Sequence, residues 1–216
     1  MTTSPDRGAL SGITSAGSFL VGIIGANAWS DAPYPRPGSA PDRIRAFFRE
    51  DPRPARLSAV AQVVSAITLA RFTASAARLA HTADRIGLLP AAAVTGGAAA
   101  TASLLASAAC TAGLTTSRAD DDARAVALHR RAFLAGGVAH GVGFGMLVGA
   151  VGLAGRRTGL LSPSLATMAL GSAAAGLLSP LYLVAEPAAW LIPIGRFSGF
   201  VVVGRAAAAM AHRSAS

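Results

Sequence analysis

Six long, mostly apolar stretches follow one another along the chain and are separated by polar connectors. An α-helix needs about 20 apolar residues to cross the hydrocarbon core of a bilayer. The first, third and fifth stretches contain no charged residue, whereas the second and the sixth each carry two arginines. The pattern predicts six membrane-spanning helices in a single all-α domain, residues 1–216, with spans at about 9–29, 57–80, 88–114, 132–155, 160–185 and 188–211.

The long connector between the first two spans has a different pattern. A proline-rich stretch is followed by Ser39–Asp42, a capping-box pattern with Pro41 in the first turn. In the residues that follow, Ile44, Phe47 and Phe48 share one helical face, and arginines surround it. The sequence therefore predicts a short interfacial helix that lies on the bilayer.

Composition and charge narrow the class of protein. Hydrophobic residues make up 52% of the chain and charged residues 13%, about half of what an ordinary soluble domain carries. These figures exclude a disordered chain, and a single cysteine excludes a disulfide scaffold. The net charge is +9, but the basic residues are scattered among apolar segments, so we expect membrane lipids as partners and no nucleic acid. All basic residues are arginine, which is typical of a GC-rich genome and favours the plasma (inner) membrane of a bacterium.

Two features of the membrane topology have alternatives. The first span ends at Ala26-Asn27-Ala28, a small-x-small pattern that also fits a cleaved signal peptide. Asp6 cancels the one arginine before this span, and five more spans follow, so we expect a retained helix. The arginine counts of different connectors favour opposite orientations, so the orientation stays open.

The fourth span carries glycines at intervals of four, namely Gly137, Gly141, Gly145 and Gly149. Small residues at this spacing form a groove that a neighbouring helix can approach closely. Gly171, Ala175 and Ser179 in the fifth span have the same spacing and are the expected facing surface. We favour packing within one bundle, and the alternative is a homo-oligomer or another membrane protein partner.

Polar side chains in the spans predict a pocket at the end of the bundle opposite the termini. The second, fourth and sixth spans begin at that end, so their residues can be compared by depth. At a rise of 1.5 Å per residue, His140 and Arg196 both lie about 12 Å along their helices. The expected lining is Asn27, Gln62, His140, Tyr182, Glu186 and Arg196.

This pocket has a functional and a structural interpretation. In the first, Arg196 holds an anionic group, His140 exchanges a proton, and Glu186 pairs with either. In the second, which we prefer on sequence alone, Arg196 satisfies carbonyls freed by Pro193 and Gly195, and His140 bonds a neighbouring helix. A polar stripe on the second span is expected either to line the same cavity or to face the bundle interior. Its residues are Thr68, Arg71, Ser75 and Arg78.

The sequence predicts no catalytic residues, no metal site and no cofactor. Cys110 stands alone in the third span, and His140 has no second histidine at a matching depth with which to hold a haem. Residues 120–122 form an acidic run that fits the first turn of a helix better than a magnesium site, because a second acidic cluster is missing. Residues 117–120 repeat the capping pattern, and we expect the helix that follows to run straight into the fourth span.

Two parts of the chain resemble a known family. They are Tyr34-Pro35 with residues 42–48 and 55–59, and Ala185-Glu186-Pro187 with residues 194–199. The pattern resembles a family of six-span membrane proteins of unknown function from high-GC Gram-positive bacteria. The resemblance covers nearly the whole chain and implies six helices and no known activity.

Three functions remain from the sequence. The favoured one is a non-enzymatic membrane component that acts through helix packing or lipid contact. The second is a small transporter, or a ligand- or lipid-binding membrane protein that uses the polar pocket. An intramembrane enzyme is the third, and no residue spacing supports it.

Overall fold

The computed structural model describes residues 6–85, 87–116 and 121–215, and these ranges form helices and no strand. Six of the helical segments are long and apolar enough to cross a membrane. This confirms the predicted all-α bundle of six spans, and such a bundle identifies a membrane protein. The segments are α1 (Arg7–Trp29), α3 (Arg53–Ala83), α4 (Leu88–Leu114), α5 (Asp122–Phe133) with η2 (Leu134–Ala139) and α6 (His140–Arg157), α7 (Pro163–Leu178) with η3 (Ser179–Leu183), and η4 (Glu186–Trp190) with α8 (Leu191–Ala215).

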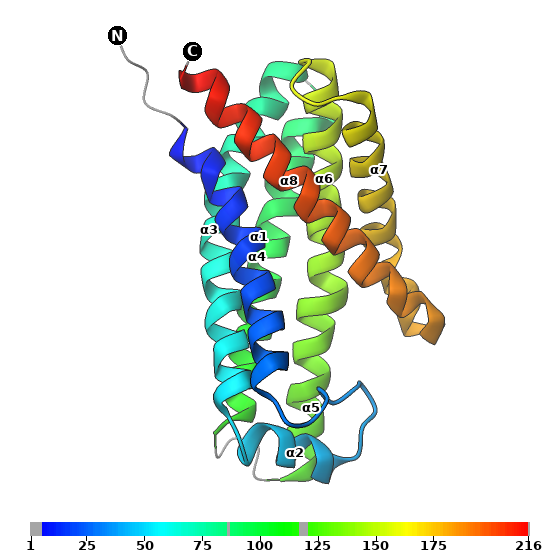
Figure 1. The fold of residues 1–216 in the computed structure, drawn as a ribbon. Coiled ribbons are helices and arrows are strands. Elements are labelled where there is room, and N and C mark those ends of the chain that lie inside the picture. Colours follow the sequence, from blue (N-terminus) through cyan, green and yellow to red (C-terminus); the bar gives the residue numbers. More distant parts are fainter. Residues whose placement is uncertain (1–5, 86, 117–120, 216) are drawn as a thin grey trace.

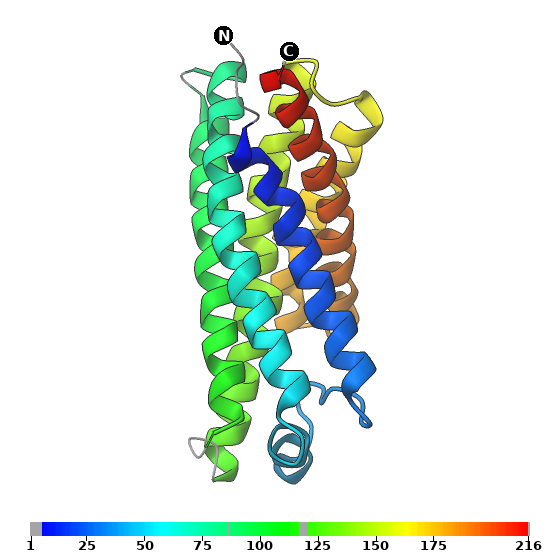
Figure 2. The same ribbon diagram turned by 60° about the vertical axis from the view of Figure 1, so that its left-hand side comes forward.

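The six segments pack as a ring in chain order. Each spanning segment packs against the next one, from α1 and α3 through α4, α6 and α7 to α8, and α8 also packs against α1. Figure 1 shows an elongated bundle in which α1 begins and α8 ends at the same end, as six spans require. The short helix α2 (Pro41–Arg49) lies at the opposite end, which Figure 2 also shows. We call this the α2 end.

The fourth segment is longer than its apolar stretch. Helix continues without a break from Asp122 to Arg157, as expected for a helix that runs straight into the span predicted from Ala132. Residues 117–120, where the capping pattern was expected, lie outside the described residues. At 1.5 Å per residue these 36 residues extend about 54 Å, well beyond a hydrocarbon core of about 30 Å. The additional turns are α5, which carries arginines in its last turn. Helix α5 therefore projects beyond the apolar part of the bundle.

Helix α6 is the most buried segment, and its glycines bring two neighbours close. A Cβ added to Gly145 would lie 3.0 Å from the carbonyl oxygen of Ala173 on α7. A Cβ added to Gly143 would lie 2.6 Å from the backbone nitrogen of Ala100 on α4. The glycines of α6 thus form contacts on two faces, since Gly141 and Gly145 face α7 while Gly143 faces α4.

The surface that faces the glycine groove differs from the expected one. Ser179 does meet Gly141, but Gly171 has no atom within 4 Å of an added Cβ. Ala175 approaches Gly195 on α8, and Ala173 and Gly176 fill the groove on α6. The expected set of Gly171, Ala175 and Ser179 is therefore wrong for Gly171 and Ala175, because four-residue steps drift around a helix of 3.6 residues per turn.

The connector helix α2 is present, but its apolar face is buried within the protein. Ile44 is 1% exposed and Phe48 is fully buried, packed with Ala55, Leu114 and Ala125. These side chains are therefore not available to a bilayer, which corrects the predicted surface orientation. The capping box is also wrong, because Ala40 is the N-cap and no side chain caps this helix.

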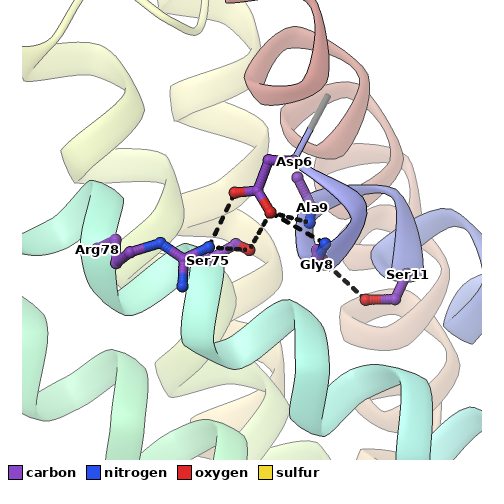
Figure 3. Close-up of polar contacts among 6 residues, drawn as sticks. All are labelled: Asp6, Gly8, Ala9, Ser11, Ser75 and Arg78. Carbon is purple, nitrogen blue, oxygen red and sulfur yellow. Dashed lines mark hydrogen bonds and ion pairs between the residues drawn. The ribbon is translucent and has the colours of Figure 1, made fainter. Parts of the chain in front are cut away.

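A polar network fixes the start of α1 to α3. The carboxylate of Asp6 accepts hydrogen bonds from the backbone N–H groups of Gly8 and Ala9 at 2.9 and 3.2 Å. It also accepts from Ser75 Oγ at 3.2 Å and from Arg78 Nη2 at 2.9 Å (Figure 3). Partial burial alone would raise the pKa of Asp6, but these hydrogen bonds and the Arg78 charge together lower it below its usual value.

Replacing Asp6 by alanine should destabilise the protein by about 1 kcal/mol at neutral pH, because helix α1 loses its N-cap. A lowered pKa in the folded state means that the stabilisation is present above the unfolded pKa and is lost as the pH falls through the folded value. Thermal unfolding at pH 7 and near pH 3 measures this. The difference between Asp6→Ala and wild type should shrink at the lower pH, and an unchanged difference would contradict the account.

Candidate functional site

A cavity of about 250 Å³ lies between α1, α3, α4, η2 and α8, toward the α2 end. Its wall mixes aromatic and aliphatic side chains with a few polar groups, and Arg196 is the only charged residue in it. The lining consists of Phe19, Ile23, Ala26, Asn27, Tyr34, Phe47, Pro54, Ala55, Ser58, Gln62, Ser107, Thr111, Ala132, Phe133, Gly136, Gly137, Ile192 and Arg196. We call it the Arg196 cavity.

Arg196 is held by one backbone oxygen and one aromatic ring. Its Nη2 donates a hydrogen bond to the carbonyl oxygen of Gly136, and its guanidinium carbon lies 4.7 Å from the ring centroid of Phe19. Its Nε is buried without a hydrogen-bond partner. Among the described residues no carboxylate forms an ion pair with Arg196. The cation is thus anchored, and its charge is not balanced by the protein around it.

The acceptor at Gly136 comes from an irregular turn. In an α-helix the N–H of His140 would donate to the carbonyl of Gly136, four residues earlier. In the π-helical turn η2 it donates to Ala135 and Gly137 instead. The Gly136 oxygen accepts from Arg196, on a different helix. The predicted structural role of Arg196 is therefore right in kind, but the freed carbonyl is that of Gly136 rather than one near Pro193.

His140 lies behind the wall of the cavity and does not line it. Its ring stacks on Phe19 and Phe144, with centroid distances of 6.2 and 5.4 Å. Its Nδ1 lies 3.2 Å from the carbonyl oxygen of Ala100. Since a carbonyl only accepts, Nδ1 carries the proton, and Nε2 is a buried acceptor without a partner. His140 therefore supports Phe19, on which Arg196 rests.

Gln62 and Asn27 line the cavity as expected. The Nε2 of Gln62 donates to Ser58 Oγ at 3.3 Å, while its Oε1 is buried without a hydrogen-bond partner. Asn27 donates to the carbonyl oxygen of Ile23 on its own helix. The cavity thus offers a cation at Arg196 and an unsatisfied acceptor at Gln62.

Tyr182 and Glu186 do not reach the Arg196 cavity, which corrects the prediction for both. They line a separate groove between α5 and the turn from η3 to η4. Phe133 stands between the two spaces, and its ring centroid is 5.1 Å from that of Tyr182. Glu186 is exposed, and its expected pairing with Arg196 or His140 is absent from the described contacts. Tyr182 and Glu186 lie at the expected depth along the bundle, but their position around the bundle axis differs from the expected one.

The polar stripe on α3 serves other contacts. Ser75 and Arg78 bind Asp6 at the end of the bundle away from the cavity. Thr68 donates to the carbonyl oxygen of Val64 on its own helix, and Arg71 is exposed. None of the four residues lines the Arg196 cavity.

Several lining residues were not predicted. Ser107 and Thr111 lie one turn apart near the end of α4, and Ser107 Oγ donates to the carbonyl oxygen of Ala132 at 3.0 Å. Their spacing and depth would have revealed them, since the third span also ends at the α2 end. Nothing in the sequence indicates the π-helical turn that presents the Gly136 carbonyl.

The arrangement can bind but offers no obvious catalytic group. A cation, an acceptor and apolar walls suit a small molecule that carries a negative charge, a hydrogen-bond donor and an apolar part. The described residues contain no group of three or more histidine, cysteine or acidic side chains placed to hold a metal ion. Comparisons with models of protein families, with curated proteins and with solved structures give no match to this chain.

Proposed function

We propose that this membrane protein binds a small anionic molecule in the Arg196 cavity, and that it acts in the plasma membrane of a bacterium. The observation that carries the proposal is Arg196 itself, a cation in a cavity wall with no carboxylate beside it. The arginine-only composition supports the bacterial source. The resemblance to six-span membrane proteins of high-GC bacteria agrees with that source and adds no activity.

An unbalanced cation favours an anionic ligand for a physical reason. Removing a guanidinium from water is costly unless a counter-charge or several hydrogen bonds replace the lost hydration. Gly136 accepts one hydrogen bond from Arg196, and Phe19 contributes a cation–π contact. A bound carboxylate or phosphate would supply the missing negative charge and accept charge-assisted hydrogen bonds.

The second polar group in the wall refines the ligand. Gln62 Oε1 accepts hydrogen bonds and cannot donate, so an anionic oxygen does not satisfy it. A hydroxyl group on the ligand would donate the hydrogen bond that this oxygen lacks. The cavity therefore favours a hydroxylated anion, such as a glycerol phosphate group, over a bare carboxylate.

Ligand binding is better supported than a role in packing against another protein. Helix α7 packs along Gly141 and Gly145, which the sequence offered as a surface for a partner. Close approach of a second chain at those glycines would require α7 to leave. Membrane lipids stay our preferred partners, and a homo-oligomer would have to use another face.

Binding of glycerol 3-phosphate to the purified protein in mild detergent tests this proposal. Arg196→Gln should weaken binding by about 10- to 100-fold, the worth of a charge-assisted hydrogen bond. Arg205→Gln is the matched control, because Arg205 lies on the same helix and is exposed. Equal binding by the two variants, or no saturable binding by wild type, would contradict the proposal.

A further inference from the structure

We propose that the occupant of the Arg196 cavity is a membrane amphiphile with an anionic headgroup and a single apolar chain, taken from the bilayer through an opening between α1 and α8. This inference rests on the proposed function and adds the class and the source of the ligand. Four features support it: the aromatic side chains at the α2 end of the cavity, the separation of α1 from α8, the exposed apolar side chains of these two helices, and the size and depth of the cavity.

An aromatic cap lies at the α2 end of the cavity, and we define it as Tyr34, Phe47, Phe48 and His129. Tyr34 and Phe47 line the cavity, and their ring centroids are 5.3 Å apart. Phe48 packs on Tyr34 and His129 with centroid distances of 5.8 and 6.0 Å. His129 Nε2 lies 3.1 Å from the carbonyl oxygen of Pro35, which ties the connector to α5. A ligand from water would have to displace this cap.

The proposed opening lies on the side of the cavity between α1 and α8. The two helices are close where a Cβ on Gly12 would lie 3.0 Å from Val203. Toward the α2 end they separate, and Figure 1 shows α8 leaning away from α1. Ile23 and Ala26 of α1, and Ile192 of α8, line the cavity along these separated parts. The proposed opening therefore faces sideways, between two membrane-spanning helices.

Helices α1 and α8 both carry exposed apolar side chains. Val21 and Ile24 on α1 are 62% and 64% exposed, and Ile194 on α8 is 55% exposed. Large aliphatic side chains at this exposure are stable in contact with hydrocarbon rather than water. An apolar chain that leaves the cavity here would meet lipid tails, whereas a free water-soluble ion would have to cross them.

Size and depth agree with a headgroup site. A volume of about 250 Å³ is just below the roughly 300–1,000 Å³ of pockets that hold drug-sized ligands, which suits a headgroup rather than a whole two-chain phospholipid. Arg196 lies five residues after the start of α8, which is about 8 Å along the helix. A headgroup bound there would sit near the edge of the hydrocarbon layer, with its chain directed into it.

Two ligands that share a headgroup test the side opening and the cavity independently of each other. Glycerol 3-phosphate supplies the headgroup alone, and 1-lauroyl lysophosphatidic acid adds one chain. Both are titrated into the wild-type protein and the variants Arg196→Gln, Ala26→Trp and Val21→Trp in the same detergent. Ala26 lines the cavity on the side of the proposed opening, while Val21 is exposed on the same helix and lies outside the cavity lining, which makes it the matched control.

We expect Ala26→Trp to weaken binding of the lysophospholipid by at least about tenfold and binding of glycerol 3-phosphate by less than about threefold. Val21→Trp should change neither, and Arg196→Gln should weaken both. Equal effects of Ala26→Trp and Val21→Trp on binding of the lysophospholipid would overturn the side opening. Equal effects of Ala26→Trp on binding of the two ligands would also overturn it. In both cases, binding that depends on Arg196 would still uphold the proposed function. If neither ligand depends on Arg196, both proposals fail. Should Ala26→Trp fail to elute as a folded protein, Ile23→Trp makes the same test.

Discussion

Phe48→Ala should destabilise the α2 end by about 3–5 kcal/mol, the usual cost of removing a fully buried phenylalanine. Phe48 packs in a small cluster with Ile44, Ala55, Leu114 and Ala125, which is separate from the main core. The loss should therefore be local. We expect amide hydrogen exchange of α2 to accelerate strongly, while α6 at the centre of the bundle keeps its protection.

Phe197→Ala is the matched control, since the same truncation is made at a side chain that is 44% exposed on α8. It should leave exchange in α2 unchanged. Uniform loss of protection over all helices in Phe48→Ala would contradict a cluster that packs separately from the main core. Unchanged exchange in α2 would contradict the burial of Phe48 in this cluster.

Gly143→Ala should destabilise the bundle by about 1–3 kcal/mol, as overpacking in a dense core does. The added methyl would lie 2.6 Å from the Ala100 nitrogen and 2.8 Å from the Gly96 oxygen, and backbone atoms cannot turn aside as a side chain can. α4 and α6 must move apart instead. His140, which bonds Ala100, would move with them and disturb Phe19 beneath Arg196.

Gly171→Ala makes the opposite prediction with the same substitution. No atom lies within 4 Å of an added Cβ at Gly171, so only helix propensity changes. Alanine in a helix interior is favoured over glycine by about 0.5–1 kcal/mol, so this variant should be slightly more stable. Thermal unfolding of both variants in one detergent measures the difference. Equal effects of the two substitutions would contradict the close approach of α4 and α6.

The fold was predictable because its strongest signals are local. Each span is visible as a long, mostly apolar run, and the end of α4 at Leu114 agrees with the sequence to the residue. Helix α5 is polar, and the capping pattern before it indicated that its helix would run into the fourth span. Its packing against α2 and α4 depends on tertiary contacts that no pattern within residues 122–131 indicates.

The candidate site was only partly predictable because the depth of a residue along the bundle does not give its position around the bundle axis. Counting residues from a helix start placed Gln62 and Arg196 at the right height, and both line the cavity. It placed Tyr182 and Glu186 equally well in height, but the rotation of the α7–α8 turn puts them beyond Phe133. Rotation around the bundle depends on which helices touch, and this follows from packing rather than from hydropathy.

The role of Arg196 shows the same limit. The sequence indicated that a deep arginine needs acceptors, and it suggested carbonyls near Pro193. The structure supplies the carbonyl of Gly136 from a π-helical turn more than fifty residues earlier. Such a turn has no sequence signature of its own, because a widened helix is stabilised by the groups that it meets.

The most direct test of the central claim is the native mass of the protein released from membranes in mild detergent. Wild type and Arg205→Gln should each carry one additional small mass, matching an anionic single-chain amphiphile, and Arg196→Gln should carry none. The same bound mass in all three proteins, or bare protein in all three, would contradict a site built around Arg196.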